Sequence, residues 1–424
     1  MTRSPTPRRA LEALAAAIVG LSGCARQDAR APEDLCKGPI AERPIPEVGV
    51  QTFVIGPALT FVTETSARIM FETSDPCVGS IVFGLAGGTL SRKVEARVER
   101  EVVQQVELSG LSASTTYEYR AEACGKVSAT QSFITAPPIG APVRFGVLGD
   151  NRSFPEDARR IADALAKTSP HFVVHSGDVV SDGDQLPEWK EQFFDPMRSL
   201  LTSMPAFIAI GNHENNARAF YEYTAYPYDP VMTDHAQFGS NYSVSYGNVY
   251  MLFVDTNSLS FLLSVALDTE LAKWVRAQVT SEAAKRATWR LAVGHHPAFT
   301  ESWSPGACDR YDGTPSVLGF LFPLMAENGF QLYLTGHTHA YERGAKRGVT
   351  QIISGGGGAD LDEICRDLPE TAVVVPEYHY LEVEAGCESL RVRAVSVPRS
   401  STVSAPRVLD EVVLERRPPR WTAN

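Results

Sequence analysis

Between residues 143 and 354 the sequence alternates short apolar runs with amphipathic segments, and five of the apolar runs end in glycine followed by polar residues. The amphipathic segments include 156–167 and 269–279, where apolar residues recur at helical spacing. Strands that alternate with helices are typical of a layered α/β sheet. Ligands in open α/β sheets bind at the carboxyl ends of the strands, so we expect the five polar strand ends to meet at one crevice.

Strands are predicted for the apolar runs of this region, at 143–148, 172–175, 206–210, 249–254, 290–293, 331–334 and 350–353. Alternating β pattern returns at 378–414. We therefore expect an α/β domain over residues 143–396, and a C-terminal tail over 397–424.

An earlier region, residues 48–136, contains β-rich runs separated by turns, at 60–71, 79–83, 102–108, 116–123 and 128–135. Several short strands at such spacing favour an all-β sandwich of immunoglobulin or fibronectin type III size. Pro137, Pro138 and Pro142 then indicate a linker to the α/β domain.

The N-terminus has the order of a secretory signal. Three arginines precede an apolar run at 13–21, and Leu21-Ser22-Gly23-Cys24 follows, which resembles a bacterial lipobox. We expect residues 1–23 to be a lipoprotein signal peptide, Cys24 to be acylated, and residues 24–47 to tether the protein to the cell envelope, on the periplasmic or cell-surface side. An ordinary signal peptide with a chance cysteine, or a buried N-terminal helix, are the alternatives. No later stretch is apolar enough to span a bilayer.

Cysteine usage agrees with export. Of seven cysteines, acylation of Cys24 leaves an even six, which favours disulfides in an exported chain. We expect Cys77–Cys124 and Cys308–Cys365, and Cys36–Cys387 remains by elimination. No Cys-x-x-Cys pair is present, so a structural zinc site is disfavoured.

Charge excludes one class of partner. Lys plus Arg number 39 against 50 Asp plus Glu, a net charge of −11, and no run of five or six basic residues occurs. The basic footprint of a nucleic-acid-binding protein is missing, so nucleic acid is not the main target.

The chemistry lies in the five strand ends. Each alone is ordinary, because Gly-Asp is usually a turn, but five of the nine histidines fall within three of these ends. Carboxylate, imidazole and amide side chains together are the ligands that two neighbouring divalent ions need, with one carboxylate able to bridge them. The strand ends read Gly149-Asp150-Asn151-Arg152, Gly177-Asp178, Gly211-Asn212-His213-Glu214, Gly294-His295-His296-Pro297 and Gly336-His337-Thr338-His339.

This order of motifs, ending in Ala340-Tyr341-Glu342-Arg343, resembles the calcineurin-like metallophosphoesterases, and most closely their purple acid phosphatase branch. The resemblance covers about residues 48–395, because that branch also has an N-terminal fibronectin-like domain. It implies a four-layer α/β/β/α core preceded by the all-β sandwich.

The resemblance also implies a role for each polar strand end. His213 would be a non-ligand that stabilises the phosphate in the transition state or protonates the leaving group, and Glu214 would hold its loop. His296 would touch the phosphate, with a place behind the ligands or on the surface as an equal alternative. The implied metal ligands are Asp150 and His339 for the first ion, Asp178 as the bridge, and Asn212, His295 and His337 for the second ion.

Two positions depart from the family pattern. Arg152 stands where the broad family often has histidine, and Ser181 stands where the purple branch has a metal-binding tyrosine. A chain without that tyrosine should not be purple. The first ion would then have only Asp150, Asp178 and His339 besides solvent. Arg152 could contact a substrate phosphate, since its planar fork suits paired oxygens, or be a plain surface arginine.

We therefore expect an exported phosphoesterase that hydrolyses a phosphorylated small molecule with a hydroxide held between two Fe, Zn or Mn ions. The run Gly355–Gly358 lacks the lysine of a P-loop and is read as a tight loop beside the site. One alternative is a phosphodiesterase or pyrophosphatase with the same site. Another is a cell-surface binding lipoprotein with one weak metal. The sequence does not indicate an oligomeric state.

Overall fold

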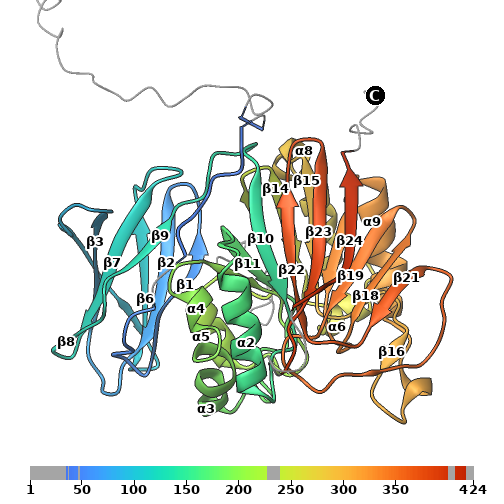
Figure 1. Ribbon diagram of the computed structural model, residues 1–424, viewed down its shortest axis with the longest axis horizontal. Coiled ribbons are helices and arrows are strands. Elements are labelled where there is room, and N and C mark those ends of the chain that lie inside the picture. Colours follow the sequence, from blue (N-terminus) through green and yellow to red (C-terminus); the bar gives the residue numbers. More distant parts are fainter. Residues whose placement is uncertain (1–34, 37, 46–47, 227–238, 400–405, 417–424) are drawn as a thin grey trace, which may run out of the picture. The chain divides into compact units, whose positions relative to one another are not determined.

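The computed structural model describes residues 35–36, 38–45, 48–226, 239–399 and 406–416 (Figure 1). The predicted signal peptide, Cys24 and the first part of the predicted tether lie outside these residues. Within them, no helix combines the length and the apolar character that crossing a membrane requires.

The N-terminal part of the described chain is built from two antiparallel sheets, with strand orders β1-β2-β6-β5 and β4-β3-β7-β8, and with β9 paired to β7. Alternate side chains of β7 are buried, as in a strand with one face on a core. The strands are β1 (Ile55–Val62), β2 (Ser66–Glu72), β3 (Ser80–Leu85), β4 (Arg92–Glu95), β5 (Arg97–Glu99), β6 (Val103–Ser109), β7 (Thr116–Ala123), β8 (Lys126–Val127) and β9 (Gln131–Ile134).

One sequence-based strand is wrong. The run 60–71 was expected to be a single strand, but it contains a turn between β1 and β2, which pair with each other. The Thr63 hydroxyl accepts hydrogen bonds from the main-chain N–H groups of Thr65 and Ser66, so side chains stabilise the turn.

Two larger sheets form the rest. One has the order β12-β11-β10-β22-β23-β24 and the other β13-β14-β15-β17-β19-β18-β21. The strands are β10 (Val143–Leu148), β11 (Phe172–His175), β12 (Ala206–Ile208), β13 (Tyr242–Tyr246), β14 (Val249–Phe253), β15 (Trp289–Val293), β17 (Leu332–Thr335), β18 (Tyr341–Lys346), β19 (Val349–Ser354), β21 (Thr371–Val375), β22 (His379–Ala385), β23 (Ser389–Ser396) and β24 (Val408–Glu415); β16 (Ser302–Trp303) pairs with β20 (Glu363–Ile364).

The two large sheets face each other and helices cover their outer sides. In β14, Met251 belongs to the core shared with the first sheet, whereas Leu252 packs in a second core with Leu271 of α7 (Glu270–Val279) and Met325 of α9 (Phe322–Glu327). Helix α2 (Pro155–Ala166) buries Ile161 and its neighbours against the first sheet. The expected α/β/β/α layering is confirmed.

The helices begin where the sequence provides start signals. Proline stands at the first position of α2, and Thr269 caps α7 by accepting a hydrogen bond from the Ala272 N–H. The remaining helical segments are short: α3 (Leu186–Glu188), η1 (Trp189–Phe194), α4 (Arg198–Leu201), α5 (Arg218–Thr224), α6 (Leu259–Leu262), α8 (Glu282–Arg286), η3 (Cys308–Arg310) and η4 (Val317–Leu321).

All three expected disulfides are present: Cys36–Cys387, Cys77–Cys124 and Cys308–Cys365.

Part of the segment expected to be a tether is attached to the folded body. The guanidinium of Arg43 donates hydrogen bonds to the carbonyls of Pro170, His171 and Ser203. At the other end, β24 lies inside the segment expected to be a tail and pairs with β23 along the edge of the sheet. Its Asp410 accepts from the Tyr341 hydroxyl at 2.6 Å.

Candidate metal centre

The polar strand ends come from both large sheets. β10, β11 and β12 are parallel neighbours in one sheet, and β15 and β17 are parallel neighbours in the other. The main-chain N–H of His337 donates to both carboxylate oxygens of Asp150 at 3.1 Å, and the His295 ring lies 2.8 Å from the Ser176 carbonyl. These contacts join the two sheets at the carboxyl ends of their strands, which is where the polar strand ends were expected to meet.

Glycines allow this close approach. A Cβ on Gly211 would lie 2.2 Å from Asp178 Oδ1, and one on Gly336 would lie 2.3 Å from Asp150 Oδ2. Both distances are far below any real contact, so each strand end must begin with glycine for the carboxylates to fit.

Four side-chain atoms converge tightly. Asn212 Oδ1 lies 3.1 Å from His295 Nε2 and 3.0 Å from His337 Nδ1. His295 Nε2 lies 3.2 Å from His337 Nδ1 and 3.3 Å from Asp178 Oδ1. Ligand atoms around one ion, at about 2.0–2.2 Å from it, lie about 2.8–3.6 Å from their neighbours. Four of the six distances among these atoms therefore fall in the range expected within a single coordination sphere.

The orientation of His295 suits that role. Its Nδ1–H donates to the Ser176 carbonyl at 2.8 Å, so Nε2 is the ring nitrogen that faces the other three atoms. Burial lowers the pKa of His295, but the Asp178 carboxylate outweighs burial and raises this pKa to about 9, so a metal ion would have to displace the proton from Nε2. Burial, followed by the neighbouring histidines, holds the pKa of His337 well below its usual range. A neutral imidazole is the form that binds a metal ion.

A second set of donors shares Asp178. His339 Nε2 lies 3.7 Å from Asp150 Oδ1, and its Nδ1 faces the Asp360 carbonyl. Burial raises the pKa of the Asp150 carboxyl well above its usual range, and the Asp178 carboxylate raises it further. A cation beside Asp150 would keep it ionised. Ligand atoms of Asp150, Asp178 and His295 all lie within 4.8 Å of one another, so this buried group could hold a metal ion and connects the second set to the four-atom cluster through His295.

Arg152 enters this second set. Its Nε lies 3.3 Å from Asp178 Oδ2, and its Nη2 lies 3.3 Å from His339 Nε2. Ser181 does not point toward the metal ligands, because its hydroxyl lies 3.0 Å from Gln192 Oε1.

His213 lies beside the ligands without joining the four-atom cluster. Its Nδ1–H donates to the Ser181 carbonyl at 2.7 Å, and its Nε2 is 3.9 Å from Asp178 Oδ2. The main-chain N–H of His213 donates to Asp178 Oδ1 at 3.0 Å. The ring is about one-third exposed, with 32% of the side chain accessible, so it can reach a bound ligand.

Glu214 and His296 surround the ligands. The carboxylate of Glu214 accepts main-chain hydrogen bonds from Asp178, Val179 and Gly211, so it fixes Asp178 as well as its own loop. Burial, and then Asp178, raise the pKa of Glu214 to about 7. The His296 ring lies 4.3 Å from the His337 ring, with Nδ1 2.9 Å from the Thr256 hydroxyl.

The glycine-rich run 355–358 is hydrogen-bonded to the strand end that carries Asp150. The N–H of Gly357 donates to the Gly149 carbonyl and that of Ala359 to the Asp150 carbonyl, both at 2.9 Å, so the glycine-rich run is a tight loop under the first carboxylate. Arg343 forms an ion pair with Asp410 of β24.

Sequence reasoning missed an aromatic wall. The rings of Trp303 and Tyr311 lie 5.2 and 5.0 Å from the His337 ring. Both residues lie in the segment that follows β15, several positions beyond His295 and His296, and the Cys308–Cys365 disulfide holds part of this segment.

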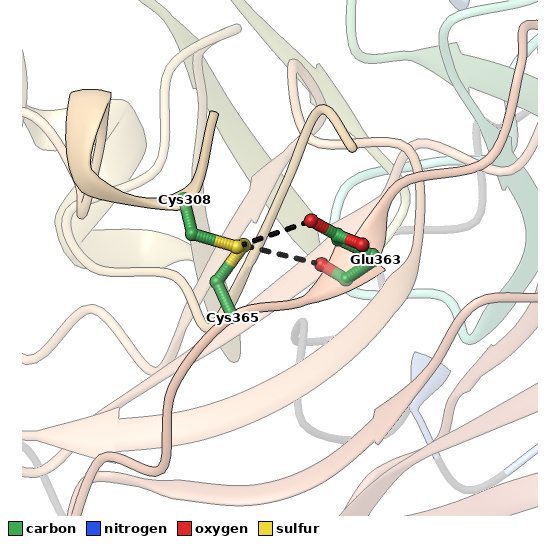
Figure 2. A group of neighbouring side chains, drawn as sticks. All are labelled: Cys308, Glu363 and Cys365. Carbon is green, nitrogen blue, oxygen red and sulfur yellow. Dashed lines mark hydrogen bonds between the residues drawn. A yellow bond between two sulfur atoms is a disulfide. The ribbon is translucent and has the colours of Figure 1, made fainter. Parts of the chain in front are cut away.

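The same disulfide explains a second group of metal-ligand residues. Cys308, Glu363 and Cys365 lie close together, and Figure 2 shows the two sulfurs meeting beside Glu363. Because the sulfurs are bonded to each other, neither is a thiolate, and thiolate is the form of cysteine that binds metal. The oxidised group is not a metal site.

A calcineurin-like phosphoesterase model matches residues 143–341, and a model for a domain of unknown function matches residues 50–138. Purple acid phosphatase 18 of Arabidopsis thaliana is 23% identical over 245 residues, which are 55% of this chain and 51% of that protein. The chain thus spans about half the length of this relative.

Two solved structures share the fold. A purple acid phosphatase from yellow lupin seeds superposes with a TM-score of 0.69 at 16% identity, over 85% of this chain and 74% of that one. The structure of PhoD superposes with a TM-score of 0.66 at 14% identity, over 86% and 90%. The chain therefore carries a calcineurin-like metallophosphoesterase domain and has purple acid phosphatases among its relatives.

Proposed function

We propose that this protein is a metal-dependent hydrolase of phosphate esters. The observation that carries the proposal is the cluster of Asp178, Asn212, His295 and His337 at the strand ends of a phosphoesterase fold, in which His295 Nε2 lies 3.1–3.3 Å from an atom of each of the other three residues and Asn212 Oδ1 lies 3.0 Å from His337 Nδ1. A single cation between these atoms would explain their short distances without a proton shared by any pair. The facing nitrogens of His295 and His337, which are 3.2 Å apart, have no evident use in a binding site without metal.

We propose positions for two ions that share Asp178. Its Oδ1 faces His295 and its Oδ2 faces the side of Arg152, so its two oxygens can serve different ions. Asp150 and His339 would complete the first position. Carboxylate, imidazole and amide donors without thiolate suit Fe, Zn or Mn.

Bound ions would supply Lewis-acid polarisation of a phosphoryl oxygen and lower the pKa of a water molecule. The chain's own contribution is to orient the ester and to neutralise charge. His213 is held by Ser181 so that Nε2 faces the centre, where it can donate to a phosphoryl oxygen or to the leaving group. His296 is proposed to contact the phosphate from the side of His337.

The substrate proposal is a phosphorylated small molecule, with a phosphodiester or pyrophosphate as the alternative for the same site. Export to the bacterial cell envelope, with a lipid on Cys24, is proposed from the lipobox-like sequence and is supported by three disulfides. Incorporation of a radiolabelled fatty acid that Cys24→Ala abolishes would test the anchor.

The test of function combines metal analysis with hydrolysis. The purified full-length chain would be reconstituted with Mn, Zn or Fe and assayed on p-nitrophenyl phosphate and on bis-p-nitrophenyl phosphate. Bound metal with turnover of either ester supports the proposal, and the preferred ester selects between the alternatives. Bound metal without turnover under any reconstitution favours the second candidate, a cell-surface binding lipoprotein, which the contact of Arg152 with two proposed ligands favours.

A further inference from the structure

The two proposed metal positions have unequal surroundings. The position formed by Asn212, His295, His337 and Asp178 Oδ1 has four donors, and no Lys or Arg contact with these four atoms occurs among the described residues. The position formed by Asp150, Asp178 Oδ2 and His339 has three donors. Arg152 contacts two of those three.

The contacts of Arg152 are with the atoms that an ion would need. Its guanidinium is 3.3 Å from Asp178 Oδ2 and 3.3 Å from His339 Nε2, and only 18% of its side chain is exposed. A guanidinium carries N–H donors and no lone pair, so it cannot become a ligand itself. A guanidinium also carries a positive charge. Arg152 therefore gives these donors the positive charge that an ion would give them.

Ser181 does not supply a fourth ligand. The Ser181 hydroxyl is 3.0 Å from Gln192 Oε1 and its carbonyl accepts from His213. An ion that entered the first position would bring two or three positive charges close to the guanidinium. It would have to displace Arg152 to bind.

We infer that Arg152 stands in for the first metal ion. The resting centre then holds one tightly bound ion, at Asn212, His295, His337 and Asp178, and the first position fills only at much higher metal concentration, when the Arg152 side chain leaves. The inference rests on the proposed function to the extent that the four-donor position binds metal.

The experiment measures metal binding and not activity. The full-length wild-type chain, Arg152→Ala and Arg152→His would each be dialysed against micromolar Mn²⁺, and retained metal would be counted by elemental analysis. Electron paramagnetic resonance would distinguish an isolated Mn²⁺ from a spin-coupled pair. Arg159→Ala is the matched control, because it removes the same charge from α2, where Arg159 pairs only with the exposed Glu156 among the contacts described.

We expect one ion and an isolated signal for the wild type and the Arg159 variant. Arg152→Ala should bind a second ion at least tenfold more tightly than the wild type, and Arg152→His, which adds an imidazole, more tightly still, with the signal of a coupled pair. Arg152→His also covers the case in which Arg152→Ala fails to fold.

Three outcomes would overturn the inference. Two ions of similar affinity in the wild type, with hydrolysis, would leave the proposed function standing and remove the role of Arg152. A single ion in both folded Arg152 variants would mean that three protein donors are too few, whatever occupies their neighbourhood. A wild type that binds no metal and hydrolyses no ester would contradict the proposed function as well.

Discussion

His213 is the residue whose removal best separates catalysis from metal binding. Its ring is anchored through Nδ1 to the Ser181 carbonyl, and its Nε2 lies 3.9 Å from Asp178 Oδ2. The hydrogen bond from His213 to Asp178 Oδ1 comes from the main chain, at 3.0 Å. Replacement by alanine keeps that bond. We therefore expect His213→Ala to bind metal as the wild type does.

The expected loss in turnover follows from the kind of interaction removed. A preorganised donor aimed at an oxygen where charge develops contributes about 10²–10³ in kcat, or about 2.7–4 kcal/mol. The ring is held in place before substrate binds, since Nδ1 is already committed to Ser181. We therefore expect kcat of His213→Ala to fall about 10²–10³-fold, with little change in KM, because the interaction strengthens only in the transition state.

The assay compares two esters. p-Nitrophenolate leaves without a proton, whereas an alkoxide needs one, so an equal loss on p-nitrophenyl phosphate and on an alkyl phosphate indicates stabilisation of the phosphoryl charge. A larger loss on the alkyl ester indicates that His213 is a general acid. Asn215→Ala is the control from the same loop, where the amide donates to Asp182 at 2.8 Å on the surface. Wild-type kcat in His213→Ala refutes the catalytic role, and lost metal would show that His213 is a ligand.

Three further changes test other parts of the structure. Asp178→Asn should lose most bound metal while keeping the fold, because asparagine tolerates the left-handed φ of 57° at this position; wild-type metal content by elemental analysis would contradict the bridging assignment. Replacing Cys308 and Cys365 by serine removes a disulfide with a sequence separation of 57, and the chain-entropy model predicts that the free energy of unfolding falls by about 4 kcal/mol. An unchanged urea midpoint would refute this value. Tyr119→Phe removes a buried hydrogen bond of 2.7 Å to the Thr202 carbonyl and should lower the free energy of unfolding by about 1 kcal/mol, whereas no measurable loss would mean that water or another donor replaces it.

The layered core could be predicted because its signals are local. Each strand of the sheet interior is a short apolar run that stops at a glycine, and the expected runs 143–148 and 172–175 coincide with β10 and β11. Parallel strands place their carboxyl ends on one edge, so the expectation that the polar ends meet needed only their order. Two of the cysteine pairs, Cys77–Cys124 and Cys308–Cys365, followed from their positions within the two predicted domains, and Cys36–Cys387 followed only by elimination.

The features that the sequence did not predict depend on contacts between residues far apart in the chain. Arg43 lies in a segment without periodicity, yet its guanidinium binds carbonyls more than 120 residues away, as the separation of 127 from Pro170 shows. The pairing of Arg152 with Asp178 and His339 spans both sheets and is equally invisible in the sequence. Main-chain carbonyls such as that of Ser181 orient the histidines, and no residue type marks a carbonyl.

The ligand loops also hold a conformation that single motifs do not reveal. Asp150, Asp178 and His337 each follow a glycine and adopt left-handed φ values of 58°, 57° and 71°. Such a conformation costs about 1–2 kcal/mol per non-glycine residue, so it persists only where the surroundings impose it.

Here the loops impose it on one another. The Asp150 N–H donates to the Gly177 carbonyl at 3.0 Å, the Asp178 N–H to the Glu214 carboxylate at 3.1 Å, and the His337 N–H to the Asp150 carboxylate at 3.1 Å. Each of these three proposed ligands is therefore fixed by a group from a different strand end. Because these bonds are made by the protein itself, the free energy of metal binding need not be spent on ordering the loops, and the difference between the two proposed positions reduces to their donors and to Arg152.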